Sequence, residues 1–250
     1  MIRDAMSRVI GIRCVSKSAA AGITAAFGEL LPPRLSPIVI YNGVDTGKYR
    51  PPTEDERRRA RAGLGIAEDA VVLGTVCRLE PVKGVMPLLD TFLEVGAAHP
   101  DLVLVFAGDG TQKRDLEEAA LASGVRPRTR FLGHREDVVS VLWSLDIFAL
   151  FSRAEGFGFA TAEAMAAGLP VLATSTGGTR ELVLHDETGY LFPFGEWPQA
   201  TSLLNGLLCS PDRLRALGRA GRIRAESHWT IERRDEAMGN FFAEILGASW

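Results

Sequence analysis

Ala70-Val-Val-Leu-Gly-Thr-Val76 and Leu102-Val-Leu-Val-Phe-Ala107 are two apolar runs that enclose an amphipathic segment. Runs with so few polar residues are typical of strands that are buried on both faces of a sheet. Between them, residues 85–98 have helical periodicity and place Leu88 and Leu89 on one apolar face. A strand, a helix and a second strand in this order predict a parallel βαβ unit.

The same alternation continues on both sides of this unit. Further strands are expected over 9–15, 37–41, 129–132, 147–151 and 171–174. Further helices are expected over 19–27, 54–63, 112–122, 137–143, 160–167 and 179–184, and the chain should be entirely helical from 196 onward. These elements predict an α/β fold with a Rossmann-like parallel sheet, helices on both faces and a helical C-terminus. We expect a single domain over 1–250, with a core at about 9–195 and a tail over 196–250.

The composition narrows the class of partner. With 46% hydrophobic residues in 250, the chain can bury a full core, and its formal net charge of −3 argues against nucleic-acid binding.

Two arginine clusters, at 57–61 and 213–224, favour solvated helix faces, and contact with an anionic membrane surface is the alternative. The three scattered cysteines suggest free buried thiols in a reducing cytosol, and the four histidines lack metal-ligand spacing. We expect neither a signal peptide nor a membrane span, because the first apolar run is far shorter than about 20 residues.

Ligands of parallel sheets bind where strands end and helices begin. The loop 78–84 places Arg78 and Lys83 between a strand and a helix, which favours a diphosphate site because the helix N-terminus adds its dipole to the two charges. The alternative is an exposed loop whose charges pair with Glu80 or with solvent. The sequence Gly108-Asp-Gly110 favours a tight turn over a phosphate cradle.

A second loop carries two glutamates that bracket the start of a helix. Glu155 precedes Gly156 and Gly158, which allow a ligand to approach the backbone closely, and Glu163 follows in or near the first helical turn. A carboxylate can accept paired hydrogen bonds from adjacent hydroxyls, as in a ribose. The alternative is that Glu163 only complements the helix dipole and that Glu155 is an exposed loop acid. In the segment 174–181, hydroxyls and glycines could line a phosphate or a sugar, but Ser/Thr capping of a helix is the favoured interpretation.

Together these residues resemble the C-terminal, donor-binding domain of the retaining glycosyltransferases of family 4, which have the two-domain GT-B fold. The resemblance covers nearly the whole chain, from Val15-Ser-Lys-Ser through Ile40-Tyr-Asn-Gly-Val-Asp45 and Arg78-Leu-Glu-Pro-Val-Lys-Gly84 to Gly168-Leu-Pro-Val. Its most specific part is the EX7E motif, Glu155-Gly-Phe-Gly followed by Glu163-Ala-Met-Ala.

The resemblance implies a role for each matching residue. Arg78 and Lys83 should bind the donor diphosphate, Glu155 should contact the sugar and stabilise the transition state, and Glu163 should hold the ribose. The stretch Leu132–Val138 should line the base. The implied catalytic residues are Glu155, Arg78 and Lys83. The implied donor-binding residues are Arg78, Lys83, Gly133, Val138, Glu155, Gly156, Phe157, Gly158, Phe159 and Glu163.

The resemblance also implies the ligands and partners. The donor should be a UDP- or GDP-linked sugar in retaining hexosyl transfer for polysaccharide or glycolipid synthesis, with no metal and no cofactor. Family members carry an N-terminal acceptor domain before Val15, and only about fourteen residues precede that point here. We therefore expect weak or absent transfer by this chain alone, unless a separate acceptor domain completes it. The alternative is a non-catalytic nucleotide-sugar binding module or an inactive fragment. We expect the protein to be located in the cytoplasm, and the alternative is a location at the inner face of the membrane. An NAD-dependent enzyme is disfavoured because no GxGxxG follows the first strand.

Overall fold

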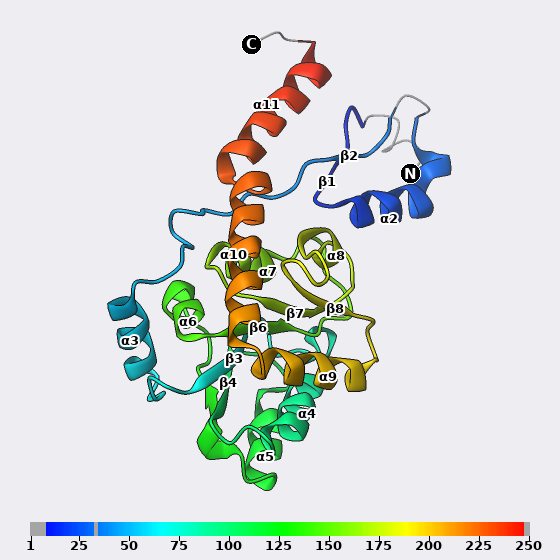
Figure 1. Cartoon of the computed structure of the whole chain (residues 1–250). Helices are drawn as coiled ribbons and strands as arrows, with labels where there is room; N and C mark the ends of the chain where they lie inside the picture. The colour runs from blue at the N-terminus through cyan, green and yellow to red at the C-terminus, as the bar shows by residue number, and fades with distance from the viewer. Residues whose placement is uncertain (1–8, 33–34, 248–250) are drawn as a thin grey trace.

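The computed structural model describes residues 9–32 and 35–247, and its centre is a six-stranded sheet (Figure 1). The strands are β3 (Val71–Val76), β4 (Leu102–Ala107), β5 (Thr129–Phe131), β6 (Ile147–Leu150), β7 (Val171–Thr174) and β8 (Gly189–Phe192). They run parallel in the order β5-β4-β3-β6-β7-β8. This is the doubly wound Rossmann order, in which the chain starts in the middle and builds outward in both directions. The predicted fold class is confirmed.

Helices cover both faces of the sheet because each central strand is apolar on both sides. In β3, Val72 packs into one core and its neighbour Leu73 into the other, as the two-residue period of a strand requires. One core is closed by α6 (Val138–Ser144), α7 (Phe159–Ala166) and α8 (Thr179–Leu182). The other is closed by α4 (Val85–Gly96), α5 (Lys113–Ala122) and α9 (Trp197–Leu208).

Several elements match the sequence expectation closely. The polar helix α3 (Glu54–Gly63) has the expected bounds, and Thr53 and Glu56 form a capping box at its start. The tail consists of α9, α10 (Pro211–His228) and α11 (Ile231–Leu246), with breaks after Leu208 and His228. Three short 3-10 helices, η1 (Gly28–Leu30), η2 (Pro81–Lys83) and η3 (Arg126–Arg128), were not predicted. Strand β8 was also missed, because only its first and last residues are buried and it has no continuous apolar run.

The first two strands do not join this sheet. β1 (Arg13–Cys14) and β2 (Ile38–Val39) pair with each other in a separate two-stranded parallel sheet, joined by α2 (Lys17–Phe27). Figure 1 shows this unit beside α11, away from the main sheet. The expectation of one sheet is therefore wrong for this segment, and both strands are shorter than predicted.

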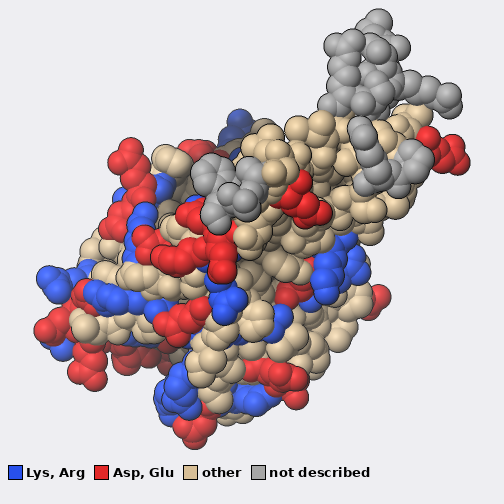
Figure 2. Space-filling view, turned by 90° about the horizontal axis from the view of Figure 1, so that it is seen from above, with Lys and Arg blue, Asp and Glu red and all other residues tan. Residues whose placement is uncertain are grey.

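The arginine cluster of α3 is only partly a solvated face. Arg61 is 3% exposed and donates to carbonyls and to Asp146 Oδ2 at 2.6 Å, and Arg57 pairs with the other oxygen of Asp146. The preferred interpretation is wrong for Arg61, which joins α3 to the start of β6. On the face seen in Figure 2, Lys and Arg are interspersed with Asp and Glu. Contact with an anionic membrane surface stays a prediction.

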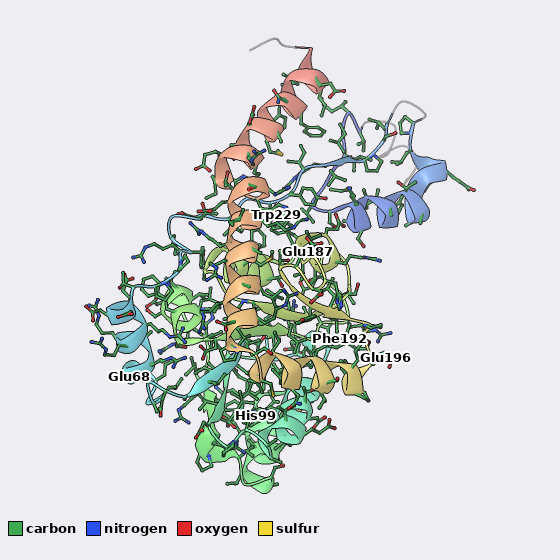
Figure 3. All side chains as sticks on the ribbon, in the orientation of Figure 1. Glu68, His99, Glu187, Phe192, Glu196 and Trp229 are labelled. Carbon is green, nitrogen blue, oxygen red and sulfur yellow. The ribbon has the colours of Figure 1, made fainter. Side chains whose placement is uncertain are left out.

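The second arginine cluster joins the tail to the core. Arg224 donates to the carbonyls of Glu181 and Leu182, and its guanidinium lies 5.0 Å from the centre of the Trp229 ring. Trp229 lies where α10 meets α11 (Figure 3) and is 3% exposed. Its carbonyl accepts the backbone N–H of Val44 at 2.7 Å. The junction of the last two helices is thus fixed to the segment that leads into α3.

Candidate functional site

The strand order places a crevice between β3 and β6. These strands are neighbours, but β3 is followed by α4 on one face and β6 by α7 on the other. Loops diverge at such a switch point and leave room for a ligand. A hollow of about 370 Å³ opens there. Its lining residues come mainly from the two loops: Asn42, Val76, Cys77, Arg78, Lys83, Leu150, Glu155, Gly156, Phe157, Gly158, Phe159 and Ala160.

Lys83 and Glu155, one from each loop, meet in this hollow. Lys83 Nζ lies 2.6 Å from Glu155 Oε1, and the two side chains are 18% and 10% exposed. Ser152 Oγ donates to the same carboxylate oxygen at 2.6 Å. Glu80 instead accepts hydrogen bonds from the backbone and hydroxyl of Thr111. The alternatives of a Glu80 ion pair and of an exposed Glu155 are therefore wrong for this loop pair.

Arg78 supplies a second positive charge. Arg78 is exposed and lines the hollow. Within residues 9–32 and 35–247, no hydrogen bond or ion pair engages its side chain. The turn at Gly108 and Gly110 backs this loop, because Leu79 exchanges backbone hydrogen bonds with Asp109 and Gln112. The tight-turn interpretation of that sequence is thus supported.

The N-terminus of α7 opens into the same hollow. Gly158 has a φ of +96°, which favours glycine, and no side chain caps the helix. The first N–H groups of a helix lack intrahelical partners, and its dipole makes this end positive. Phe157 is buried beneath the loop, whereas Phe159 is half exposed at its rim. The hollow therefore combines two cations with a positive helix end.

The segment after β7 supports the glutamate loop from behind. Gly177 has a φ of +48°, and a Cβ there would lie 1.7 Å from the carbonyl oxygen of Glu155. The hydroxyls of Thr174 and Thr176 donate to the carbonyl of Ser152 at 2.5 and 3.0 Å. Gly178 caps α8 without a side-chain hydrogen bond, so the Ser/Thr helix-cap interpretation is wrong.

Glu163 lies in the second turn of α7 rather than its first, so the helix-dipole alternative is wrong. It is partly buried, and Tyr49 and Lys48 lie near its carboxylate. Burial raises the pKa of Glu163, while Tyr49 and the charge of Lys48 oppose that increase. Burial and the Glu163 charge raise the pKa of Tyr49 to about 12. The phenol is therefore neutral at physiological pH.

Three predicted residues, Gly133, Val138 and Glu163, do not line the 370 Å³ hollow. The carbonyl of Gly133 accepts the N–H of Gly108 at 2.8 Å, and Val138 begins α6. Arg135 and Asp137, from the loop expected to line the base, border a different hollow of about 470 Å³ between α3 and α6.

Sequence patterns gave no role to three residues around the site, Ser152, Glu181 and Tyr41. The Glu181 carboxylate accepts two N–H groups at the start of α2, each at 2.9 Å, and the hydroxyl of Tyr41 at 2.8 Å. Glu181 thus holds β1, α2 and β2, which we call the N-terminal unit, against α8. These residues have no motif of their own, and only their partners reveal their role.

Metal-ligating clusters and membrane-spanning helices are both absent from the described residues. Within residues 9–32 and 35–247, no cluster of three or more His, Cys, Asp or Glu could hold a metal ion. No helix in the described part of the chain is long and apolar enough to cross a membrane.

Solved structures show the same architecture. HepE from Anabaena, solved with UDP-glucose, superposes with a TM-score of 0.85 over 97% of this chain and 67% of its own, at 25% identity. The C-terminal domain of the group 1 glycosyl transferase LpcC from Francisella tularensis superposes with a TM-score of 0.69 over 76% of this chain and 100% of its own, also at 25% identity. The chain thus has the fold of a GT-B C-terminal domain.

Proteins with similar sequences are also glycosyltransferases by name. A GDP-mannose-dependent monoacylated α-(1-6)-phosphatidylinositol monomannoside mannosyltransferase from Corynebacterium glutamicum is 34% identical over 80% of this chain and 54% of its own. A D-inositol 3-phosphate glycosyltransferase from Corynebacterium urealyticum is 37% identical over 70% of this chain and 43% of its own. The chain thus spans about half the length of these relatives. The family model described as glycosyl transferases group 1 matches residues 56–224. The chain belongs to the group 1 glycosyl transferase family.

Proposed function

We propose that this chain binds a UDP- or GDP-linked sugar as the donor half of a retaining hexosyltransferase. The observation that carries the proposal is the hollow between β3 and β6, where Arg78, Lys83 and the start of α7 face one space beside Glu155. Two cations and a positive helix end suit a diphosphate, and an adjacent carboxylate suits sugar hydroxyls.

The chemistry follows from where charge develops. Breaking the bond between the sugar and the phosphate builds negative charge on the diphosphate. Fixed positive groups in a partly closed cleft stabilise such charge, and this stabilisation usually accelerates a reaction more than any other single effect. In this proposal Arg78 and Lys83 meet the diphosphate without a metal or cofactor, and Glu155 supports positive charge on the sugar. Retention would follow attack from the face that the diphosphate leaves.

The other donor groups extend away from the diphosphate. Glu163 would hold the ribose hydroxyls and the loop 132–138 would contact the base. Gly156, Phe157, Gly158 and Phe159 would contact the sugar or the phosphates through the backbone. The positions of Gly133 and Val138 outside the 370 Å³ hollow suit a base that lies beyond the ribose.

We propose that the acceptor site lies on a second α/β domain that docks on the N-terminal unit and α11. Parallel sheets are normally larger and covered on both faces, yet β1 and β2 form a sheet of only two strands in the described part of the chain. Ile10 and Leu246 nearby are 63% and 64% exposed, beside a hollow of about 340 Å³. In Figure 2 the coloured, described part of the projection is mostly tan, with few charged side chains. Further strands would extend this sheet and cover its apolar surface.

A nucleotide-sugar screen tests donor binding. Thermal stabilisation and calorimetry with UDP- and GDP-sugars should identify a ligand, since a ligand at about 100 times its Kd adds roughly 2.7 kcal/mol to stability. Arg78→Ala, Lys83→Ala and Glu163→Ala should each remove most of the shift. Arg114→Ala, which removes an exposed side chain of α5, is the matched control. A full shift in all three site variants would refute the site.

Turnover assays separate the two candidate functions. Donor hydrolysis by this chain, with transfer only when an acceptor domain is added, would support the transferase half. Binding without hydrolysis or transfer, even with that domain, would favour the non-catalytic binding module. Robust transfer to an acceptor by this chain alone would refute the need for a second domain.

A further inference from the structure

Asn42 lies just after β2, yet it lines the 370 Å³ hollow that the loops after β3 and β6 mainly build. Its side chain is held from β1. Arg13 Nη2 donates to Asn42 Oδ1 at 2.6 Å, and Arg13 Nε donates to the carbonyl of Ile40 at 3.1 Å. Because the guanidinium is a planar, rigid group, these two hydrogen bonds fix the Asn42 amide relative to the end of β2.

The contact with Arg13 determines which end of the Asn42 amide remains for a ligand. A guanidinium carries only N–H donors, so the amide atom that faces it is the oxygen. In the part of the chain that the structure describes, no hydrogen bond engages the Asn42 NH₂ group. Because the residue lines the hollow, two N–H groups are left for a ligand that enters it.

The backbone on both sides of Asn42 is fixed in place. The hydroxyl of Tyr41 donates to Glu181 at 2.8 Å, and the centre of its ring lies 6.4 Å from that of Phe157 in the loop after β6. On the other side, a Cβ at Gly43 would lie 2.6 Å from a backbone atom of α11. Asn42 is thus held beside the loop after β6, and a side chain that is already ordered loses little entropy when a ligand binds.

Asn42 and Glu155 together suit a hydroxyl group, which both donates and accepts hydrogen bonds. Lys83 and Ser152 both donate to Glu155 Oε1, each at 2.6 Å, so Oε2 keeps acceptor positions for a ligand. The NH₂ group of Asn42 supplies the N–H that a hydroxyl bonded to this carboxylate can accept. The cations of the hollow suit a diphosphate, whereas a neutral amide suits an uncharged sugar.

We propose that Asn42 donates a hydrogen bond to a hydroxyl of the sugar in the nucleotide sugar, and that Arg13 is a positioning residue that holds the amide for this contact. The inference rests on the proposed function, because it takes Glu155 as the carboxylate beside the sugar. It assigns a sugar contact to a residue outside the EX7E motif and makes β1 part of the site. Asn42 acts on the sugar rather than on the base, the ribose or the phosphates.

The test compares nucleotide sugars with their nucleoside diphosphates. Calorimetry should measure the Kd of UDP-glucose and UDP, and of GDP-mannose and GDP, and give the ratio of the first Kd to the second in each pair. In Asn42→Ala the ratio of the pair that binds should rise about three- to tenfold above the native ratio, since a neutral hydrogen bond contributes roughly that factor. Asn205→Ala removes an exposed amide on α9 that contacts His99, and as the matched control it should keep the native ratio.

Asn42→Asp separates sugar binding from a structural role. Aspartate keeps an acceptor for Arg13 and nearly the same volume, so the fold is preserved, but its ionised carboxylate has no N–H to donate. It should raise the ratio at least as much as alanine does. A native ratio in either variant would overturn the inference, even if both ligands bound more weakly, because the proposed contact acts on the sugar selectively.

Two further outcomes complete the test. Arg13→Ala should raise the ratio in the native chain but no further in Asn42→Ala, because Arg13 acts through the amide, and a further rise would overturn its positioning role. Binding of UDP or GDP without either nucleotide sugar would also overturn the inference, since the site would then not accommodate a hexose. Failure of UDP and GDP to bind the native chain would instead refute the proposed function itself.

Discussion

Glu155→Gln should tighten the binding of a bare nucleoside diphosphate, even though it should abolish use of a sugar donor. In the free protein Lys83 is already engaged by Glu155 at 2.6 Å, and both side chains are largely buried. A diphosphate must therefore share Lys83 with a carboxylate that also repels it. Glutamine removes the repulsion and leaves Lys83 available, while it keeps a side-chain oxygen for Ser152 and fills the same volume.

The size of the effect follows from the strength of the contact. A hydrogen bond between charged groups contributes about 1.5–3 kcal/mol, against about 0.5–1.5 kcal/mol for a neutral one. The difference, roughly 1 kcal/mol or somewhat more, corresponds to about five- to tenfold tighter binding. Lys83→Ala should act in the opposite direction, because it removes the cation itself.

Calorimetry with UDP and with GDP measures the change in affinity of Glu155→Gln directly. Glu118→Gln removes an exposed carboxylate that is paired with Arg114 on α5, and it should leave the affinity unchanged. Weaker diphosphate binding by Glu155→Gln would refute the reasoning. It would mean that Glu155 orients Lys83 toward the phosphates and does not compete with them.

Two other predictions concern stability and pH. Asp146→Ala should lower the free energy of unfolding by about 3–5 kcal/mol, because it leaves the buried Arg61 without its carboxylate, as urea denaturation will show. Asp146→Asn should cost less, because it can still accept the N–H of Val72, whereas the exposed Arg58→Ala should stay within about 0.5 kcal/mol of the native chain. Burial raises the pKa of Glu163, so ribonucleotide affinity should begin to fall, as the pH is lowered, at a higher pH than for an ordinary glutamate. Calorimetry against Glu163→Gln isolates this loss, because the titration of the phosphates is common to both proteins; identical pH profiles would contradict it.

The same pKa increase has a consequence for stability with a definite sign. Because the folded state favours the protonated form of Glu163, its stabilising contribution is present below the ordinary glutamate pKa and is lost as the pH rises through the raised value. Above that raised value the ionised, partly buried carboxylate therefore reduces stability. It is retained in a site where the proposed ligand would use its charge.

Local patterns were sufficient where neighbours along the chain decide the structure. The strand Leu102–Ala107 and the helix Glu54–Gly63 have the predicted bounds, because continuous apolar residues and a capping box act over a few residues. The two loops with Arg78, Lys83 and Glu155 were also predicted, since residues that follow parallel strands share one edge of the sheet. In β8 only the end residues are buried, so no pattern marked it.

The α/β class, the loops of the site and the family resemblance could all be derived from the sequence alone. The pairings between distant segments could be seen only in the folded protein: β1 with β2 apart from the main sheet, and Arg61 with Asp146. The physical reason is that burial and ion pairing depend on which surfaces meet, and nothing local distinguishes the buried Arg61 from the exposed Arg58 on the same helix. The motif glutamate Glu155 could be read from the chain, but its contacts with Lys83 and Ser152 could be found only in the folded protein.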